Sequence, residues 1–261
     1  MRPPAYHLAM PVHYGSGVVF ASPHSGRDYS DSFLKQSVLD RNLIRSSEDA
    51  FVDQLFACAP DHGCAFLHAS APRAFVDLNR NNTELDSAVI TGVTKSVYTP
   101  RVLSGLGVIP RVVSNSRAIY RGKLTLDEAT KRLDQYWRPY HTRLQSLLSA
   151  AQASFGQAIL IDCHSMPSAS VTFPASARPE FILGDRFGGS CDFRVTRCAR
   201  QVISNLKYQV QLNRPYAGGF ITEHYGRPAD QFHALQIEIN RGLYLNEQSL
   251  ERSRRFESFK A

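Results

Sequence analysis

The sequence predicts an α/β protein, in which buried strands alternate with amphipathic helices along the chain. Short apolar runs without polar alternation, at 18–22 and 158–161, are typical of strands that are buried on both faces. Segments with apolar residues at helical spacing lie between such runs, and this interleaving favours a sheet covered by helices. The 261 residues, 43% of them hydrophobic, are enough for one large core, so we expect a single domain over 1–261.

In the first third of the chain we expect a helix between short elements of sheet. The strands and a third short element are expected over 17–22, 64–69 and 75–80. The helix should begin at 46–49, where serines and acids precede an apolar stripe, and end at Pro60. Glu48 and Asp49 also suit the helix dipole, so capping alone could explain both acids.

The middle of the chain combines an irregular stretch with the longest predicted helix. Residues 84–118 have no clear period, and a stretch of this length is typical of a functional loop or lid. Thr125 and Glu128 form a capping box that begins the helix, and Pro139 is expected to kink it. Gly156 ends the helix and leads into the central strand.

The last third continues the alternation of strands and helices. Strands are expected over 180–185, 208–212 and 233–243, and a helix over about 191–204. The segment 213–228 contains Gly218 and Gly219, which permit a close approach of backbone to a ligand. The charged tail from Glu247 is expected to form a surface helix.

The balance of charge is basic and bears on the choice of partner. Thirty Lys and Arg against twenty-three Asp and Glu give a formal charge of +7. Many arginines stand singly beside Gly, Pro or Asn, and spaced guanidinium groups suit the capture of carboxylates better than they suit a nucleic-acid backbone. We therefore expect a small anionic substrate, with no nucleic acid and no membrane as partner.

Cysteine usage bears on the compartment. The five cysteines form no C-x-x-C pair, no apolar signal segment stands at the N-terminus, and no run is long enough to cross a bilayer. These features predict a reduced cytoplasmic protein. A homodimer is expected from base rates alone.

Three strands end in polar side chains that could form one centre. His24, His164 and Glu238 each follow or end a buried strand, and the carboxyl ends of parallel strands are where sites are built in α/β sheets. Catalytic zinc takes three ligands from His and carboxylate groups, so His24, His164 and either Glu48 or Asp49 would suffice. Asp162 lies two residues before His164, on the same face of its strand, and could orient that imidazole.

Two rival interpretations follow from the same residues. Cys163 and His164 could act as a thiol nucleophile and its base, although neighbours on a strand point to opposite faces and cannot meet. A basic nucleic-acid-binding domain is the non-enzymatic alternative, but the dispersed charge shows no recognised binding motif.

Five motifs follow one another in order over about residues 20–245. They are Pro23-His24-Ser25-Gly26, Asp77-Leu78-Asn79-Arg80, Asp162-Cys163-His164-Ser165, the segment from Gly218 to Pro228, and His233-Ala234-Leu235-Gln236-Ile237-Glu238. Together these motifs resemble the N-formylglutamate amidohydrolase family. The resemblance implies a three-layer α/β/α sandwich on a mixed, mostly parallel sheet. Such a fold is zinc-carboxypeptidase-like, of the phosphorylase/hydrolase-like class, and related to aspartoacylase.

The resemblance also implies a role for each matched residue. His24 and His164 match the metal-ligand histidines, Asp49 fits the carboxylate ligand better than Glu48 does, and Glu238 matches the catalytic acid. Residues implied in holding the substrate are Asn79, Arg80, Arg111, Thr222 and Arg227.

The reaction implied by the resemblance is hydrolysis of a linear amide with one Zn²⁺ per chain. Glu238 would take a proton from the attacking water and return it to the leaving amine. N-formyl-L-glutamate would give formate and L-glutamate. Hydrolysis of another N-acyl amino acid or a small peptide is the alternative.

Overall fold

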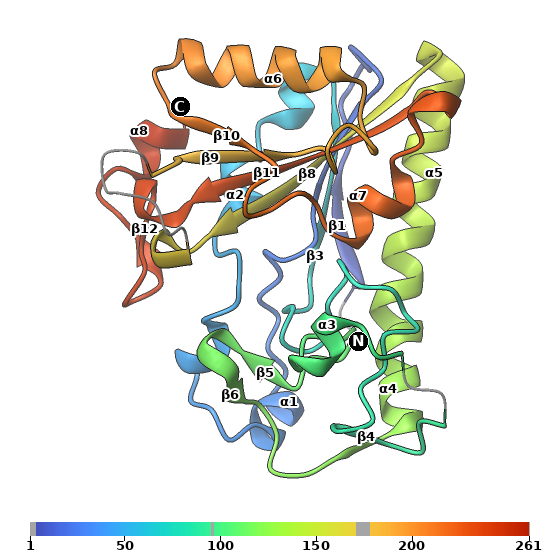
Figure 1. Ribbon diagram of the computed structural model, residues 1–261, viewed down its shortest axis with the longest axis vertical. Coiled ribbons are helices and arrows are strands. Elements are labelled where there is room, and N and C mark those ends of the chain that lie inside the picture. Colours follow the sequence, from blue (N-terminus) through green and yellow to red (C-terminus); the bar gives the residue numbers. More distant parts are fainter. Residues whose placement is uncertain (1–3, 95–96, 171–177, 261) are drawn as a thin grey trace. The chain divides into compact units, whose positions relative to one another are not determined.

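The computed structural model describes residues 4–94, 97–170 and 178–260 (Figure 1). The chain divides into two compact units. The first comprises Met1–His7, Pro23–Glu48 and His68–Arg143, and the second comprises Leu8–Ser22, Asp49–Leu67 and Leu144–Ala261. The single domain expected from the sequence stays a prediction.

A seven-stranded sheet is the framework of the fold. In spatial order its strands are β1 (Tyr6–Ala9), β3 (Ala65–Ala69), β2 (Val18–Ser22), β8 (Ala158–Met166), β11 (Phe232–Asn240), β9 (Phe181–Gly184) and β10 (Val210–Leu212). Strand β8 runs parallel to both β2 and β11, and β10 runs parallel to β9, whereas β9 is antiparallel to β11. The predicted α/β class with a mixed, mostly parallel sheet is confirmed.

The two central strands divide their side chains between an apolar and a polar face. Cys163 and Leu235 lie in the main hydrophobic core, which is also lined by helix α6 (Phe193–Asn205) and helix α8 (Phe256–Lys260). Helix α7 (Phe220–Tyr225) contacts β11 and β8. Because successive residues of a strand point to opposite faces, the polar residues of β8 and β11 share the face away from this core.

The longest helical segment contains a π-helical turn close to Pro139, where a kink was expected. Thr125 Oγ1 accepts a hydrogen bond from the Glu128 amide at 3.1 Å, as expected for a capping box, and begins α4 (Leu126–Arg132). A π-helical turn over Leu133–Trp137 then leads into α5 (Arg138–Phe155). Proline lacks the amide that a regular helix would need at this point, so a π-turn immediately before it is a physical consequence.

Several local expectations were wrong in extent. The helix expected to begin at 46–49 is only α2 (Val52–Leu55), because Phe51 adopts a left-handed φ of 63° at its start. The stretch 75–80 forms no strand, and the tail beyond 247 contains β13 (Glu251–Arg252) before the short helix α8.

Short elements also occur where none was expected. The stretch 84–118 contains β4 (Ile90–Thr91), α3 (Pro100–Leu103), β5 (Val112–Val113) and β6 (Arg117–Ala118). The remaining helices and strands are α1 (Asp31–Gln36), β7 (Leu124–Thr125) and β12 (Leu245–Asn246). Helix α7 lies within the segment 213–228, whose glycines were expected to permit a close approach of backbone to a ligand, and β1 precedes the first strand expected from the sequence.

Candidate functional site

In the second unit, four polar residues stand side by side on β8 and β11. The register pairs Gln236 with Asp162 and Glu238 with His164. Residues two apart on a strand point to the same face, so Asp162 and His164 share one face of β8, and Gln236 and Glu238 share one face of β11. Because the two strands are paired in this register, all four side chains lie on one face of the sheet. They are buried, with exposed fractions of 0% to 8%. The C-terminal halves of two central strands therefore form a buried polar centre.

His164 lies between two carboxylates. Its Nδ1 is 2.9 Å from Asp49 Oδ2, and its Nε2 is 3.0 Å from Asp162 Oδ2. Burial by itself would lower the pKa of His164, but Asp162, Asp49 and Glu238 outweigh it and raise this pKa well above its ordinary value. The surroundings of the imidazole therefore favour a positive charge, which a proton or a bound cation can supply.

Asp49 is held on its other side by an arginine. Arg241 Nη2 donates to Asp49 Oδ1 at 2.9 Å, and Arg241 Nε donates to Ser165 Oγ at 3.1 Å. Asp49 is 1% exposed and stands just before α2, outside the helix whose first turn the sequence assigned to it. Its carboxylate is thus ordered by long-range contacts and does not cap a helix.

Glu48, the alternative to Asp49 as the carboxylate ligand, binds Arg45 and Tyr29 in the first unit. Its Oε2 accepts a hydrogen bond from Arg45 Nε at 3.0 Å, and its Oε1 accepts one from Arg45 Nη2 at 3.2 Å. Tyr29 Oη donates to the same Oε2 at 3.2 Å. Burial raises the pKa of Tyr29 well above its ordinary value, and the neighbouring Glu48 raises it further. Glu48 is therefore engaged in an ion pair with the partly exposed Arg45.

Glu238 is oriented by a neighbour on its own strand. Gln236 Nε2 donates to Glu238 Oε1 at 2.9 Å, while Gln236 Oε1 accepts from the Gly219 amide at 3.0 Å. The backbone donor at Gly219 dictates which way the Gln236 amide faces. The start of α7 therefore sets the position of the Glu238 carboxylate through one intervening side chain.

In the first unit, His24 is buried against Asp77. His24 Nε2 lies 2.7 Å from Asp77 Oδ1, and Arg73 Nη2 donates to Asp77 Oδ2 at 2.9 Å. Burial tends to raise the pKa of Asp77, but His24, Arg80 and Arg73 hold it well below its usual range. The glycine that follows at position 26 predicts a sharp turn that leaves the imidazole exposed at the strand tip, and this prediction is wrong, since only 2% of His24 is exposed.

The turn after His24 requires a glycine at position 26, because another loop packs closely against it. A Cβ added at Gly26 would collide with the carbonyl of Ala71, in the same unit. The φ of Gly26 is not in the left-handed region that several other glycines adopt, so its backbone conformation does not require a glycine. The close approach of two loops therefore requires Gly26.

The expected substrate-binding residues of the first unit are engaged in local contacts. Arg80 Nε donates to the Leu106 carbonyl at 2.9 Å, and Arg80 Nη1 donates to the Asn79 carbonyl at 2.7 Å. Arg111 Nε donates to Asp86 Oδ2 at 3.0 Å. These contacts order both guanidinium groups, and contact with a substrate stays a prediction for them and for Asn79.

The two expected substrate-binding residues of the second unit also have local partners. Thr222 Oγ1 is fully buried and donates to the Gly219 carbonyl at 2.8 Å, which stabilises the first turn of α7. Arg227 stacks over Phe232 and lies 3.4 Å from Asp230 Oδ2 through its Nε. Their contact with a substrate likewise stays a prediction.

The donor set fits a metal ion. The three predicted ligands, Asp49 and His164 of the second unit and His24 of the first, are a candidate triad by their chemistry, because two imidazoles with one carboxylate are a ligand set used at catalytic zinc. Each imidazole has a buried carboxylate beside it, Asp77 for His24 and Asp162 for His164. Such carboxylates orient ligand histidines and raise their basicity.

Sequence reasoning missed the partners that order these groups. Gln236 and Arg241 lie two residues before and three residues after Glu238, within or beside a quoted motif, and Asp77 begins another. An isolated Gln, Arg or Asp has no spacing that distinguishes it from a surface residue. Only the proximity of these residues to a proposed site residue could have drawn attention to them.

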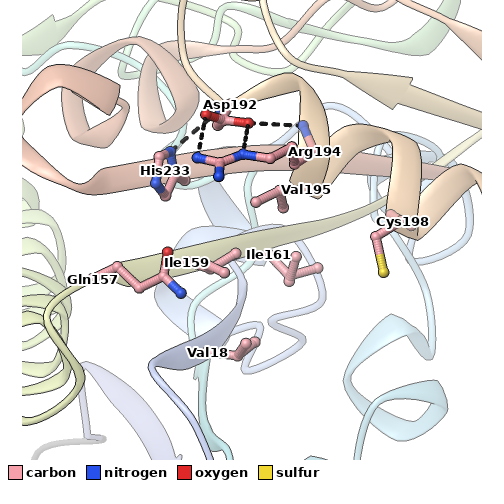
Figure 2. A pocket seen from close by; sticks show the side chains of 10 residues that line it. Val18, Gln157, Ile159, Ile161, Asp192, Arg194, Val195, Cys198 and His233 are labelled. Carbon is pink, nitrogen blue, oxygen red and sulfur yellow. Dashed lines mark hydrogen bonds and ion pairs between the residues drawn. The ribbon is translucent and has the colours of Figure 1, made fainter.

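A cavity of about 470 Å³ lies elsewhere in the second unit (Figure 2). Apolar side chains of β2, β8 and α6 line most of it, and its lining among the described residues includes none of the predicted site residues. Its charged groups pair with each other, since Arg194 Nε donates to Asp192 Oδ1 at 3.0 Å and the Asp192 amide donates to His233 Nδ1 at 3.3 Å. The cavity opens on the apolar face of the sheet and is distinct from the polar centre of β8 and β11.

Cys163 belongs to that apolar face as well. It is fully buried in the hydrophobic core, and burial raises the pKa of its thiol well above the ordinary value. A thiolate nucleophile is therefore disfavoured at this position. No helix among the described residues is long and apolar enough to cross a membrane.

Comparisons with known proteins identify a family for this chain. Residues 16–245 match the model of the N-formylglutamate amidohydrolase family. N-formylglutamate deformylase of Pseudomonas putida is 29% identical over 88% of this chain and 82% of its own length, and the enzyme of that name from Pseudomonas aeruginosa is 28% identical over 89% and 83%.

Solved structures extend the comparison to the fold. The crystal structure of N-formylglutamate amidohydrolase from Ralstonia eutropha is 32% identical, has a TM-score of 0.91, and is matched over 98% of this chain and 92% of that one. A protein from Agrobacterium tumefaciens, 15% identical with a TM-score of 0.68 over 95% and 89% of the two chains, shares the fold. The chain belongs to the N-formylglutamate amidohydrolase family.

Proposed function

We propose that this protein is a metal-dependent deformylase that hydrolyses N-formyl-L-glutamate to formate and L-glutamate. The observation that supports this most is a family match over 16–245 that includes the buried group of Asp49, His164 and Glu238. Relatives that are 28% and 29% identical are named for this activity. The small anionic substrate also agrees with the formal charge of +7.

In this proposal, His24, Asp49 and His164 hold one zinc ion. Support comes from the donor set and from the carboxylates around His164, which favour a cation there. When bound, zinc polarises a carbonyl and lowers the pKa of water to about 7. Asp77 and Asp162 keep the two imidazoles oriented.

Glu238 acts as the general base and then as the general acid. Its carboxylate takes a proton from the water that attacks the formyl carbon. It gives that proton to the amide nitrogen as the C–N bond breaks, so that formate and a free amine leave. Gln236 holds one oxygen of this carboxylate, at 2.9 Å, and so fixes the orientation of the base.

Arginines hold the carboxylates of the substrate. Arg80 with Asn79 binds one carboxylate, and Arg111, Thr222 and Arg227 contribute the remaining contacts. A planar guanidinium group can bind a carboxylate through two hydrogen bonds, which fixes the amide relative to the base. A cytoplasmic location and a homodimer stay predictions from the sequence.

A panel of substrates tests the proposal. Purified protein is incubated with N-formyl-L-glutamate, N-formyl-L-aspartate, N-formyl-L-leucine and N-acetyl-L-glutamate, and released amine and formate are measured. We expect kcat/KM to be highest for N-formyl-L-glutamate. Preference for another N-acyl amino acid would support the broader amidohydrolase alternative, and no hydrolysis of any member would contradict the proposal.

A further inference from the structure

Arg241 is a buried arginine at the end of the last central strand. It begins the short 3-10 helix Arg241–Leu243 directly after β11, and only 5% of it is exposed. Its guanidinium group donates to Asp49 at 2.9 Å and to Ser165 at 3.1 Å. One side chain therefore connects Asp49 with the residue that follows His164 on β8.

The two oxygens of Asp49 have different partners. Oδ1 accepts from Arg241 Nη2 at 2.9 Å, whereas Oδ2 lies 2.9 Å from His164 Nδ1. Rotation of the carboxylate would exchange or mix these roles. The bond to Arg241 holds the carboxylate plane so that Oδ2 is the oxygen directed at the imidazole.

The choice of arginine has a physical reason. A rigid guanidinium fork can donate to two acceptors at once, here Asp49 and Ser165, while a lysine ammonium is a single mobile point charge. Ser165 is 4% exposed and Asp49 is 1% exposed, so these two acceptors are buried. A buried ion pair of this kind resists displacement, because removal of one partner leaves an uncompensated charge.

We propose that Arg241 is a positioning residue for the metal site and presents Asp49 through Oδ2 alone. This inference rests on the metal-dependent function proposed above. Arg241 touches neither substrate nor metal in this role and acts through Asp49. Loss of such a partner typically reduces metal affinity about 10- to 100-fold.

Electrostatics alone predicts the opposite sign. Removal of a positive charge next to a metal ligand makes the site more negative and should tighten the binding of a cation. A positioning role predicts weaker binding in spite of that gain. The direction of the change in affinity therefore separates the two roles.

The test measures the zinc dissociation constant of metal-free protein by competition with a chromophoric chelator. The variants are Arg241→Met, Arg241→Lys and Ser165→Ala, and Arg132→Lys is the matched control. Arg132 is 2% exposed and pairs with Glu128 at 2.6 Å in the first unit, so it has similar burial and no link to Asp49. The unfolding midpoint of each metal-free protein reports separately on the fold.

We expect Arg241→Met to weaken zinc binding about 10- to 100-fold, Arg241→Lys to weaken it less, and Arg132→Lys to leave it unchanged. If Arg241→Met does not fold, the Lys variant decides. Unchanged or tighter zinc binding by the folded variants would overturn the inference while leaving the proposed function intact. Absence of zinc binding by the wild-type protein would overturn the metal site itself, and the inference with it.

Discussion

Each buried histidine of the candidate triad has a carboxylate from its own unit beside it. Asp77 lies 2.7 Å from His24 Nε2, and Asp162 lies 3.0 Å from His164 Nε2. A histidine with such a partner keeps one ring orientation, which prepares the other nitrogen for a ligand role. At the scale of single residues, the candidate site thus consists of pairs. In each pair the histidine is the proposed metal ligand, and the carboxylate beside it fixes the orientation of the imidazole ring.

Replacement of Glu238 tests the general base. Glu238→Gln keeps the size of the side chain and can still hydrogen bond to Gln236, but it cannot accept the proton. We expect kcat for N-formyl-L-glutamate to fall at least about 100-fold, with zinc content and unfolding midpoint unchanged. A rate close to that of the wild-type protein would remove Glu238 from the mechanism.

Replacement of Gln236 tests how Glu238 is held. Gln236→Leu removes both the donor to Glu238 and the acceptor for the Gly219 amide, 2.9 and 3.0 Å away. We expect kcat to fall about tenfold, by less than for Glu238→Gln, and KM to change little. Steady-state kinetics on both variants measures this order, and a larger loss for Gln236→Leu would contradict it.

At the scale of elements, strand β8 separates chemistry from packing by alternation. Asp162 and His164 belong to the polar face, and Ile161 and Cys163 belong to the main hydrophobic core. Adjacent residues of one strand therefore serve different purposes. The same division on β11 places Gln236 and Glu238 opposite to Leu235 and Ile239.

A substitution at Cys163 separates these two faces. Cys163→Ala removes a buried sulfur from the core and should lower the free energy of unfolding by roughly 1 kcal/mol. Because Cys163 faces away from the polar centre, kcat should stay within about twofold of the wild-type value. Denaturant unfolding and kinetics on one preparation check both statements, and loss of turnover in a folded variant would revive the thiol mechanism.

Asp192, the N-cap residue of α6, predicts that the stability of the protein depends on pH. Hydrogen bonds from the Arg194 side chain and amide lower the pKa of Asp192 to about 2. A depressed pKa means that Asp192 stabilises the fold fully above its ordinary pKa of about 3.9, and that this stabilisation is lost as the pH falls toward 2.

Asp192→Ala should therefore be less stable than the wild-type protein at pH 6, and the difference should shrink as the pH approaches 2. Asp192→Asn keeps a side-chain acceptor for the Arg194 amide and is the control. Unfolding midpoints over this range of pH measure the effect. If the difference in unfolding midpoint between the wild-type protein and Asp192→Ala did not change with pH, the stabilising role of the charged Asp192 carboxylate would be contradicted.

At the scale of the whole molecule, the proposed ion links binding to stability. A ligand that binds only the folded protein stabilises it by about 2.7 kcal/mol at 100 times its dissociation constant. For a chain of this size, that corresponds to roughly 5–10 °C in the unfolding midpoint.

We therefore expect chelator treatment to abolish hydrolysis and to lower the midpoint by about this amount. Zinc should restore both quantities, and magnesium, which prefers oxygen ligands, should restore neither. Calorimetry with and without each metal makes the comparison. Full activity of protein shown to be metal-free would contradict the metal site.

Local sequence determined the central strands and the longest helix. Apolar runs placed β2, β8 and β11 to within a few residues, the capping box placed the start of α4, and the order of elements predicted the α/β class. The motif residues His24, Asp49, His164 and Glu238 could likewise be named, because strand ends and a family resemblance mark them. These features depend on neighbours along the chain, so the sequence contains them.

The tertiary structure alone decided how these residues are held. Asp49 meets His164 across 115 positions and Arg241 across 192, whereas the adjacent Glu48 pairs with Arg45 only three positions away. Phe51 interrupts the expected helix, so Asp49 is ordered by these distant partners and not by a helix end. Contacts between remote positions depend on how the chain folds back on itself, and no local pattern of residues records that.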